Sequence, residues 1–270
     1  MSILLSNKIL TIVIVTYNPP IDELEKTLVS ILNQTWNDYE VLIIDGGSEG
    51  SIIECISLFA NDCNKKGIGC RVISEPDQGI YDAMNKGIKY AEGDWIIYIN
   101  AGDYLYKCDV LESIEVYLER GNEDVIYGNI VAKDGEETQI FKPRLLKRIK
   151  KEIPFCHQAV FTKRTAMRQG FDISYTLCAD YDFYLGAYIG GMKFRYVDQV
   201  ISYYSLDGVS SQNMVRLRNE IYDIRKKYGT IRISKSMYLI YHSIRANIRR
   251  RVPRLALEAT RTLRKVIRGR

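Results

Sequence analysis

The sequence predicts an α/β fold with a mostly parallel sheet flanked by helices, and three observations support it. Over residues 1–131, short β-branched runs alternate with longer segments whose apolar residues recur at helical spacing. The strand segments are mostly continuous apolar runs, as is typical of strands buried on both faces of a parallel sheet. The composition, 46% hydrophobic and 26% charged, is that of a globular chain.

The elements of this fold follow one another along the first half of the chain. Five segments have strand character: Leu10 to Thr16, Val41 to Asp45, Arg71 to Glu75, Trp95 to Asn100 and Val125 to Val131. Four segments between them have the periodicity of amphipathic helices: Ile21 to Asn33, Ser51 to Asn61, Ile80 to Ala91 and Cys108 to Arg120. Residues 132–214 have a less regular pattern.

The C-terminal region differs from the rest in charge. Residues 215–270 hold 17 Lys and Arg against 3 Asp and Glu, whereas residues 1–214 hold 21 basic and 30 acidic side chains. We therefore expect two regions, an acidic body at 1–214 and a basic C-terminus at 215–270. Apolar residues at helical spacing predict two basic amphipathic helices there, separated by Pro253: Met237, Ile240, Tyr241, Ile244 and Ile248, then Leu255, Ala259, Leu263 and Ile267.

Several classes of protein are excluded by what the sequence lacks. No apolar run approaches the ~20 residues that cross a bilayer, and the run Ile9 to Val15 is too short for a signal-peptide core. We therefore expect a cytosolic protein. The six cysteines form no C-x-x-C pair and the chain has 2 histidines, which argues against a structural zinc site. The segment Thr16 to Pro20, after the first strand, is neither a Walker loop nor a dinucleotide-binding glycine motif.

Polar loops follow the first four predicted strands. They are Thr16 to Asn18, Asp45 to Ser48, Glu75 to Gly79 and Asn100 to Asp103. In an open parallel sheet, ligands bind outside the carboxyl ends of the strands, so the four loops predict one polar site. Each loop taken alone is also compatible with an ordinary turn or helix cap. Acidic side chains prevail in the loops, so a diphosphate would need a divalent cation held by oxygen ligands such as Asp103.

Together, these segments resemble the ordered motifs of a known family. Five segments, the four loops with their flanking residues and one further dipeptide, carry the resemblance: Val15 to Asn18, Ile43 to Ser48, Glu75 to Gly87, Gly93-Asp94 and Asn100 to Asp103. They look like the motifs of glycosyltransferase family 2, which has the GT-A fold, over residues 9–210. The segment Asp77 to Gly87 is similar to that of members that build bacterial surface polysaccharides. The resemblance implies inverting transfer from a nucleotide-diphosphate sugar, with a nucleotide-sugar half at 1–131 and an acceptor half at 132–214.

The resemblance also implies roles for individual residues. Thr16, Tyr17 and Asn18 would line the base and ribose, and Asp45 would hydrogen-bond the base. Asp77, Asn85 and Lys86 fall where the family contacts the nucleotide and phosphates. Asp103 matches the last acidic residue of the family's metal motif, but Asn100 and Gly102 stand where further acidic residues are common. Asp103 would then hold Mg²⁺ or Mn²⁺ nearly alone, with diphosphate and water completing the shell.

A general base is needed within about 3 Å of the acceptor hydroxyl. Asp180 falls on the family's base position, where a Glu-Asp pair usually precedes a helix, and Ala179 replaces the Glu. Two other interpretations remain: Asp180 as the N-cap of a helix from Tyr181 to Ile189, or Asp182 as the base. Residues two apart on a helix point about 200° apart, so Asp180 and Asp182 would not share one task.

The predicted function is transfer of a sugar to a growing, lipid-linked glycan. Two functions compete with it: an inactive module that binds a nucleotide sugar or glycan at the membrane, and a sugar nucleotidyltransferase. The second would need a Gly-rich basic loop after the first strand, which is absent. His157 and Gln158 lie where the family shapes the acceptor side. We expect residues 215–270 to bind the anionic inner face of the plasma membrane, and we expect no nucleic-acid partner.

Overall fold

The computed structural model describes residues 8–134, 137–204 and 213–251. The chain divides into two compact units, Met1–Met214 and Val215–Arg270. The boundary falls where the charge of the sequence changes from acidic to basic.

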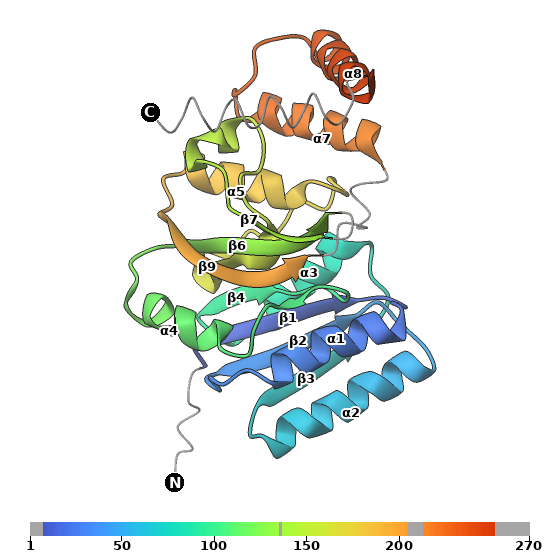
Figure 1. Ribbon diagram of the computed structural model, residues 1–270, viewed down its shortest axis with the longest axis vertical. Coiled ribbons are helices and arrows are strands. Elements are labelled where there is room, and N and C mark those ends of the chain that lie inside the picture. The colour runs from blue at the N-terminus through green and yellow to red at the C-terminus, as the bar shows by residue number, and fades with distance from the viewer. Residues whose placement is uncertain (1–7, 135–136, 205–212, 252–270) are drawn as a thin grey trace. The chain divides into compact units, whose positions relative to one another are not determined.

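The first unit begins with a parallel sheet, as predicted. Its strands are β1 (Leu10–Thr16), β2 (Tyr39–Asp45), β3 (Gly69–Ser74) and β4 (Trp95–Tyr98), in the order β3-β2-β1-β4 (Figure 1). The connecting helices are α1 (Ile21–Leu32), α2 (Ser51–Lys65) and α3 (Ile80–Tyr90). Each predicted element is therefore present, with shifts of a few residues at the ends.

Beyond β4 the sheet becomes mixed, which the sequence pattern did not predict. β8 (Val160–Lys163) pairs antiparallel with β4, and β6 (Val125–Asp134) pairs antiparallel with β8 and parallel with β9 (Phe194–Tyr204). The short β5 (Tyr104–Leu105) and β7 (Glu137–Phe141) pair antiparallel with β9 and β6. The remaining helical elements of this unit are α4 (Val110–Arg120), α5 (Ala179–Ile189), and the 3₁₀ turns η1 (Leu146–Lys150), η2 (His157–Ala159) and η3 (Arg164–Met167).

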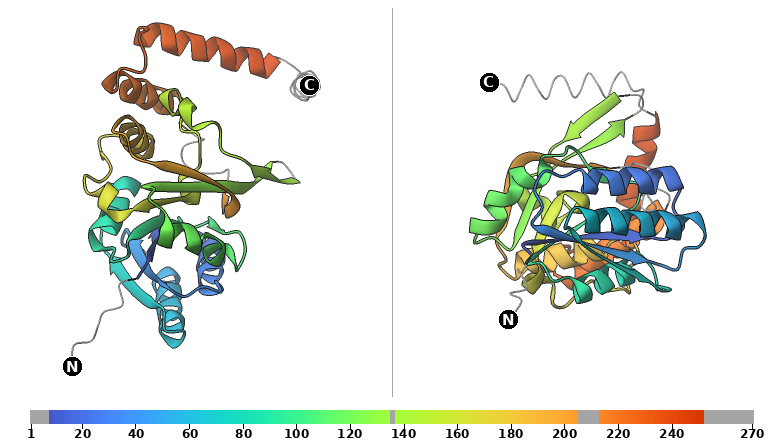
Figure 2. Two further views of the ribbon diagram at one scale, coloured as in Figure 1. Left: turned by 90° about the vertical axis from the view of Figure 1, so that its left-hand side faces the viewer. Right: turned by 90° about the horizontal axis from the view of Figure 1, so that it is seen from below.

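The core lies on both faces of the sheet. Alternate residues of β1 separate into two apolar clusters, with Ile12 and Ile14 on one face and Val13 and Val15 on the other. The first cluster includes buried residues of α1, α2 and α4, and the second includes residues of α3 and the start of α5. Both faces of β1, β2 and β4 are therefore covered, which explains their mainly apolar sequences, whereas the edge strand β3 is partly exposed (Figures 1 and 2).

Strand register aligns residues at the carboxyl edge of the sheet. Thr16 of β1 lies opposite Asp45 of β2, and Asp45 lies opposite Ser74 of β3. After β4 the chain continues beside β1, because the Ala101 amide donates to the Val15 carbonyl at 3.3 Å. The four predicted polar loops therefore begin at one edge, as expected.

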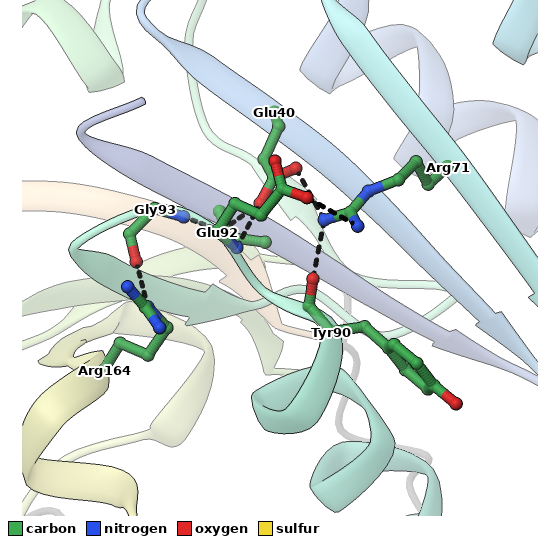
Figure 3. Close-up of polar contacts among 7 residues, drawn as sticks. Glu40, Arg71, Tyr90, Glu92, Gly93 and Arg164 are labelled. Carbon is green, nitrogen blue, oxygen red and sulfur yellow. Dashed lines mark hydrogen bonds and ion pairs between the residues drawn. The ribbon is translucent and has the colours of Figure 1, made fainter. Parts of the chain in front are cut away.

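The amino edge of the same sheet carries a second polar network (Figure 3). Buried Glu40 accepts hydrogen bonds from the Thr11 hydroxyl at 2.7 Å and from Nη2 of Arg71 at 2.9 Å. The Thr11 hydroxyl accepts from the Gly93 amide at 2.9 Å, and Arg164 donates to the Gly93 carbonyl at 2.7 Å. This network joins the starts of β1, β2 and β3 to the turn before β4.

The second unit contains α7 (Met214–Lys227) except for its first residue, and α8 (Lys235–Arg251). Its core consists of Tyr222, Ile231 and Tyr238. The helix predicted around Met237 to Ile248 is present as α8, whereas the one predicted from Leu255 to Ile267 lies outside the described residues. None of the helices in the described part of the chain has the length and apolar character of a membrane span.

Candidate active site

Asp45 is the most deeply buried acidic side chain at the carboxyl edge. Its Oδ2 accepts hydrogen bonds from the Ser74 hydroxyl at 2.6 Å, the Ser48 amide at 2.9 Å and the Gly47 amide at 3.2 Å. Its Oδ1 is buried and has no hydrogen-bond partner among the described residues. One oxygen thus fixes the carboxylate to β3 and to its own loop, and the other is left as an acceptor.

Tyr17, Gly46 and Asp77 meet beside this carboxylate. A Cβ at Gly46 would come within 2.6 Å of Oδ2 of Asp77 and 3.1 Å of the Tyr17 ring. A larger residue at position 46 would therefore push the Asp77 and Tyr17 side chains out of this arrangement. The Tyr17 side chain is 65% exposed, so an aromatic face stands open next to two carboxylates. Asn18 adopts a positive φ of 42°, and its amide donates to the Ser48 hydroxyl at 2.8 Å, which joins the first two loops.

The third loop is held by contacts of its own side chains. Oδ1 of Asp77 accepts from the Gly79 amide at 2.8 Å, and Nζ of Lys86 donates to the Pro76 carbonyl at 2.8 Å. Lys86 also forms an ion pair with Glu75 at 3.0 Å. Lys86 therefore orders the loop, and its contact with the phosphates stays a prediction.

Asn85 bonds to the backbone across the unit. Its Nδ2 donates to the Phe171 carbonyl at 2.9 Å, and its Oδ1 accepts from the Phe171 amide at 2.7 Å. Both ends of the side-chain amide thus fix the segment after η3 to α3. A nucleotide contact by Asn85 stays a prediction.

The fourth loop places Asp103 in a buried position. The Thr27 hydroxyl of α1 donates to the Asp103 carbonyl at 2.7 Å and accepts from the Gly102 amide at 3.0 Å. Gly102 has a φ of 99°, which favours glycine. The Asp103 side chain accepts a hydrogen bond at Oδ2 from Nε2 of buried Gln158 at 2.9 Å. The carboxylate is therefore oriented by η2, which the sequence pattern did not predict.

The metal prediction depends on Asp103. Within residues 8–134, 137–204 and 213–251, no cluster of three or more His, Cys, Asp or Glu side chains is placed to hold a metal ion. The described residues thus do not form a complete coordination shell. An oriented carboxylate with few protein ligands fits an Mg²⁺ or Mn²⁺ ion that takes its other ligands from diphosphate and water.

Asp180 lies in the first turn of α5 and contacts two other elements. Its Oδ1 accepts from the Tyr81 hydroxyl of α3 at 2.9 Å and from the Tyr181 amide at 2.8 Å. Its Oδ2 is 3.3 Å from Nδ1 of His157. Nε2 of His157 in turn is 3.4 Å from Nδ2 of Asn100. Asp180 is therefore connected through one imidazole to the loop that follows β4.

Asp180 is not the N-cap of α5, which was one of the interpretations of the sequence. The helix begins at Ala179, and Cys178 occupies the N-cap position. Asp180 is consequently the second helical residue, because the helix starts two residues before the predicted Tyr181. Asp182, two positions later, is buried.

Burial keeps three ionisable side chains near Asp180 in their protonated, uncharged form. It raises the pKa of the Tyr81 hydroxyl well above the usual value, and the charge of Asp180 raises it further. Burial also raises the pKa of Tyr184 and of the Cys156 thiol. The charges of both Asp103 and Asp180 contribute to the rise at Cys156, so these two carboxylates act on the same thiol.

Three buried polar atoms without a hydrogen-bond partner in the described structure lie at the carboxyl edge. They are the Thr16 hydroxyl at the end of β1, Oδ1 of Asp45 at the end of β2, and Oδ1 of Asn100 after β4. Leaving such groups unpaired typically costs about 1–3 kcal/mol each. Three adjacent strand ends therefore offer hydrogen-bonding capacity that a polar ligand would satisfy.

Ser74 was missed entirely at the sequence level, and Gln158 was named on the acceptor side without its role toward Asp103. Ser74 orients Asp45, and Gln158 orients Asp103. Ser74 could have been found from strand alignment, because the last residues of neighbouring parallel strands lie side by side. Nothing in the sequence pattern indicates that Gln158 reaches Asp103, which is 55 positions away.

Comparison with known proteins agrees with this geometry. A model of the family "Glycosyl transferase family 2" matches residues 11–180. A PGL/p-HBAD biosynthesis glycosyltransferase from Mycobacterium bovis (strain BCG / Pasteur 1173P2) is 30% identical over 197 residues, covering 70% of this chain and 73% of the relative.

Solved structures share the fold at low sequence identity. The mannosyltransferase PcManGT from Pyrobaculum calidifontis, in complex with GDP-Man and Mn²⁺, is 15% identical with a TM-score of 0.64, over 84% of this chain and 66% of that one. S. aureus TarS 1–349 in complex with UDP-GlcNAc is 14% identical with a TM-score of 0.61, over 80% and 64% of the two chains. These likenesses support a GT-A-like fold.

Proposed function

This chain belongs to glycosyl transferase family 2 and is a nucleotide-sugar-dependent glycosyltransferase, and from that premise we propose that it transfers a sugar, with inversion, to a growing lipid-linked glycan. The observation that carries the proposal is the set of unpartnered polar atoms of Thr16, Asp45 and Asn100 at three strand ends. A nucleoside diphosphate sugar has the donors and acceptors that such an edge needs.

The donor is proposed to bind with its base at the first two loops. Oδ1 of Asp45, which is buried without a partner in the described structure, would accept a hydrogen bond from the base, and the exposed Tyr17 ring would stack on it. Thr16 and Asn18 would contact the ribose side, and Asp77 and Lys86 would lie toward the phosphates. UDP and GDP occur in the ligands of the two structural neighbours, so both are the probes to use.

The binding experiment is calorimetry with UDP and GDP, with and without Mn²⁺. We expect one of the two to bind, and the Asp45→Ala variant to bind it about 10-fold or more weakly, since a hydrogen bond to a charged group contributes about 1.5–3 kcal/mol. If neither nucleotide binds at millimolar concentration, the proposed function is wrong.

Asp103 is proposed to hold the divalent ion. When bound, this ion supplies positive charge that stabilises the departing diphosphate. We expect Asp103→Ala to lower the rate at least about 100-fold, because removing one group that stabilises developing charge typically has an effect of this size. The measurement is nucleoside diphosphate release from a panel including UDP-GlcNAc and GDP-Man, with Mn²⁺ or with chelator. Full activity in chelator would contradict metal dependence.

Asp180 is proposed as the general base. As the acceptor O–H bond breaks, its proton passes to the Asp180 carboxylate and its electron pair forms the bond to the anomeric carbon. The bond from that carbon to the diphosphate breaks, and its electron pair leaves with the diphosphate. A single displacement of this kind inverts the anomeric configuration. The inactive binding-module alternative predicts nucleotide binding without release of diphosphate from any donor.

The C-terminal unit is proposed to dock on an anionic membrane surface, where a lipid-linked acceptor would lie. On α8, Met237, Ile240, Tyr241 and Ile244 are 54–60% exposed and recur at helical spacing. The strongly basic composition of residues 215–270 complements anionic lipid, which attracts each nearby basic residue by about 1 kcal/mol. The basic residues Arg254, Arg261, Arg264, Lys265, Arg268 and Arg270 lie outside the described residues.

Sedimentation with vesicles containing phosphatidylserine tests this proposal. We expect the full chain to bind at low salt and to be released by high salt. Ile240→Glu combined with Ile244→Glu should weaken binding, whereas Val116→Glu, at a 47% exposed position of α4, should not. A full chain that stays in the supernatant at low salt would contradict membrane docking.

A further inference from the structure

The contacts of Asp180 distinguish its two carboxylate oxygens. Oδ1 accepts two hydrogen bonds, from the Tyr81 hydroxyl and the Tyr181 amide. Oδ2 instead faces Nδ1 of His157 at 3.3 Å. The side chains of His157 and Asp180 are 20% and 13% exposed, so the pair is largely withdrawn from water but still reachable. With Oδ1 engaged by two donors, Oδ2 is the oxygen better placed to receive a further proton.

The two contacts of His157 agree on one arrangement of its ring protons. Nε2 faces the Nδ2 donor of Asn100 at 3.4 Å, so in the neutral imidazole Nε2 acts as the acceptor. The proton then resides on Nδ1, which is the nitrogen that faces the Asp180 carboxylate. A carboxylate partner commonly fixes a histidine tautomer in this way.

Other titratable groups near Asp180 come from three elements. Tyr81 belongs to α3, Tyr184 to α5, Cys178 precedes α5 and Cys156 precedes η2. Burial raises the pKa of Tyr81, Tyr184 and Cys156, so these three stay protonated near neutral pH. His157 is a further ionisable neighbour, and its Nδ1 is the nitrogen that faces Oδ2 of Asp180.

We propose that His157 is a positioning residue for sugar transfer, whose Nδ1–H donates to Oδ2 of Asp180 and holds that carboxylate aimed at the acceptor hydroxyl. This inference rests on the proposed function of Asp180 as general base. Through Asn100, the same imidazole ties the base to the strand end that carries part of the donor site. Gln158, the next residue of η2, orients Asp103, so one turn aligns both carboxylates.

The first experiment needs no substrate. The chain has 2 histidines, so ¹⁵N-labelled histidine gives two sets of ring signals, and a His242→Asn variant assigns them. We expect neutral His157 to carry its proton on Nδ1, and its titration midpoint to fall in Asp180→Asn, because an anionic partner is lost. The signals of His242 should not change in that variant. Neutral His157 protonated at Nε2, or a midpoint insensitive to Asp180→Asn, would overturn the inference.

The second experiment compares two variants of His157 by pH profile. Asn places an N–H near the position of Nδ1, whereas Phe removes it. With whichever of UDP-GlcNAc or GDP-Man is turned over, we expect His157→Phe to lower kcat about 10- to 100-fold with KM for that donor unchanged.

The acidic limb of the His157→Phe profile should move to higher pH, because a carboxylate without its donor is protonated more readily. His157→Asn should restore part of the rate and the position of the limb. An unmoved acidic limb in His157→Phe would overturn the inference. If the wild-type chain binds neither UDP nor GDP, the proposed function is contradicted instead. The NMR titration would still test the His157–Asp180 contact in that case.

Discussion

The two edges of the parallel sheet use buried polar residues in opposite ways. At the amino edge, the Thr11 hydroxyl donates to Glu40 and accepts from the Gly93 amide. At the carboxyl edge, the Thr16 hydroxyl on the same strand is buried without a partner in the described structure. Both threonines are less than 5% exposed, so burial alone does not separate them.

This difference in hydrogen bonding distinguishes polar groups that stabilise the fold from polar groups that are available to bind a ligand. Glu40 is saturated by Thr11, Arg71 and the Glu92 amide, and Figure 3 shows Arg71 between Glu40 and the Tyr90 carbonyl. Such a network contributes to stability. Unpartnered atoms at the other edge reduce stability until something binds them. We therefore expect changes at the amino edge to affect unfolding, and changes at the carboxyl edge to affect binding and rate.

The largest effect should come from the carboxylate connected to the carboxyl edge. Asp180→Asn is expected to lower the rate of diphosphate release by about 10² to 10⁴, as removal of a general base typically does. UDP or GDP affinity should stay within about twofold, because Asp180 is not placed in the donor site. Glu40→Gln serves as the amino-edge control and should keep its rate below the unfolding temperature. An active Asp180→Asn with an inactive Asp182→Asn would assign the base to Asp182 instead.

Two glycine-to-alanine substitutions, one at each edge of the sheet, should have effects of intermediate size. A Cβ at Gly93 would come within 2.6 Å of the Thr11 amide nitrogen and 2.7 Å of the Leu10 carbonyl carbon, so the backbone would have to move. We expect Gly93→Ala to lose about 3 kcal/mol of unfolding free energy, at the upper end for overpacking.

Gly46→Ala provides the matched change at the other edge. Its Cβ meets side-chain atoms of Asp77 and Tyr17, which can give way more easily than the backbone atoms near Gly93. We expect little loss of stability but about tenfold weaker nucleotide binding, or about 1.4 kcal/mol. Urea unfolding and calorimetry measure both variants, and equal loss of stability in the two would contradict the distinction between the edges.

The smallest effects on stability and nucleotide affinity should come from two Thr-to-Val changes on β1, one at each edge of the sheet. Thr11→Val leaves the Gly93 amide without its acceptor and should cost about 1–3 kcal/mol of stability with no effect on nucleotide binding. Thr16→Val removes a hydroxyl that has no partner, so stability should stay the same or rise slightly. Nucleotide affinity should fall about 3- to 10-fold, the equivalent of one hydrogen bond. If Thr16→Val leaves UDP and GDP affinity unchanged, its hydroxyl is not a ligand contact.

Much of the parallel half of the fold was predictable from the sequence. The strand β1 has the predicted bounds, Leu10–Thr16, because its β-branched run is bounded by turn-forming residues on both sides. The strands β5, β7, β8 and β9 were not predicted. Their sequences are short or only partly apolar, and they are held in the sheet by partners distant in sequence, which local periodicity does not reveal.

The sequence by itself determined the α/β class, the four polar loops and the identity of the residues at each strand end. The class and the loops follow from local sequence patterns. The meeting of the loops at one edge follows because the carboxyl ends of parallel strands lie at the same edge of a sheet. Only the tertiary structure decided which polar atoms have partners. Thr11 and Thr16 are the same residue type on one strand, and their difference arises from Glu40 and Gly93, brought to Thr11 by strand register. The contact of His157 with Asp180 was likewise decided by the tertiary structure, since contacts between residues distant in the chain depend on topology and not on local sequence.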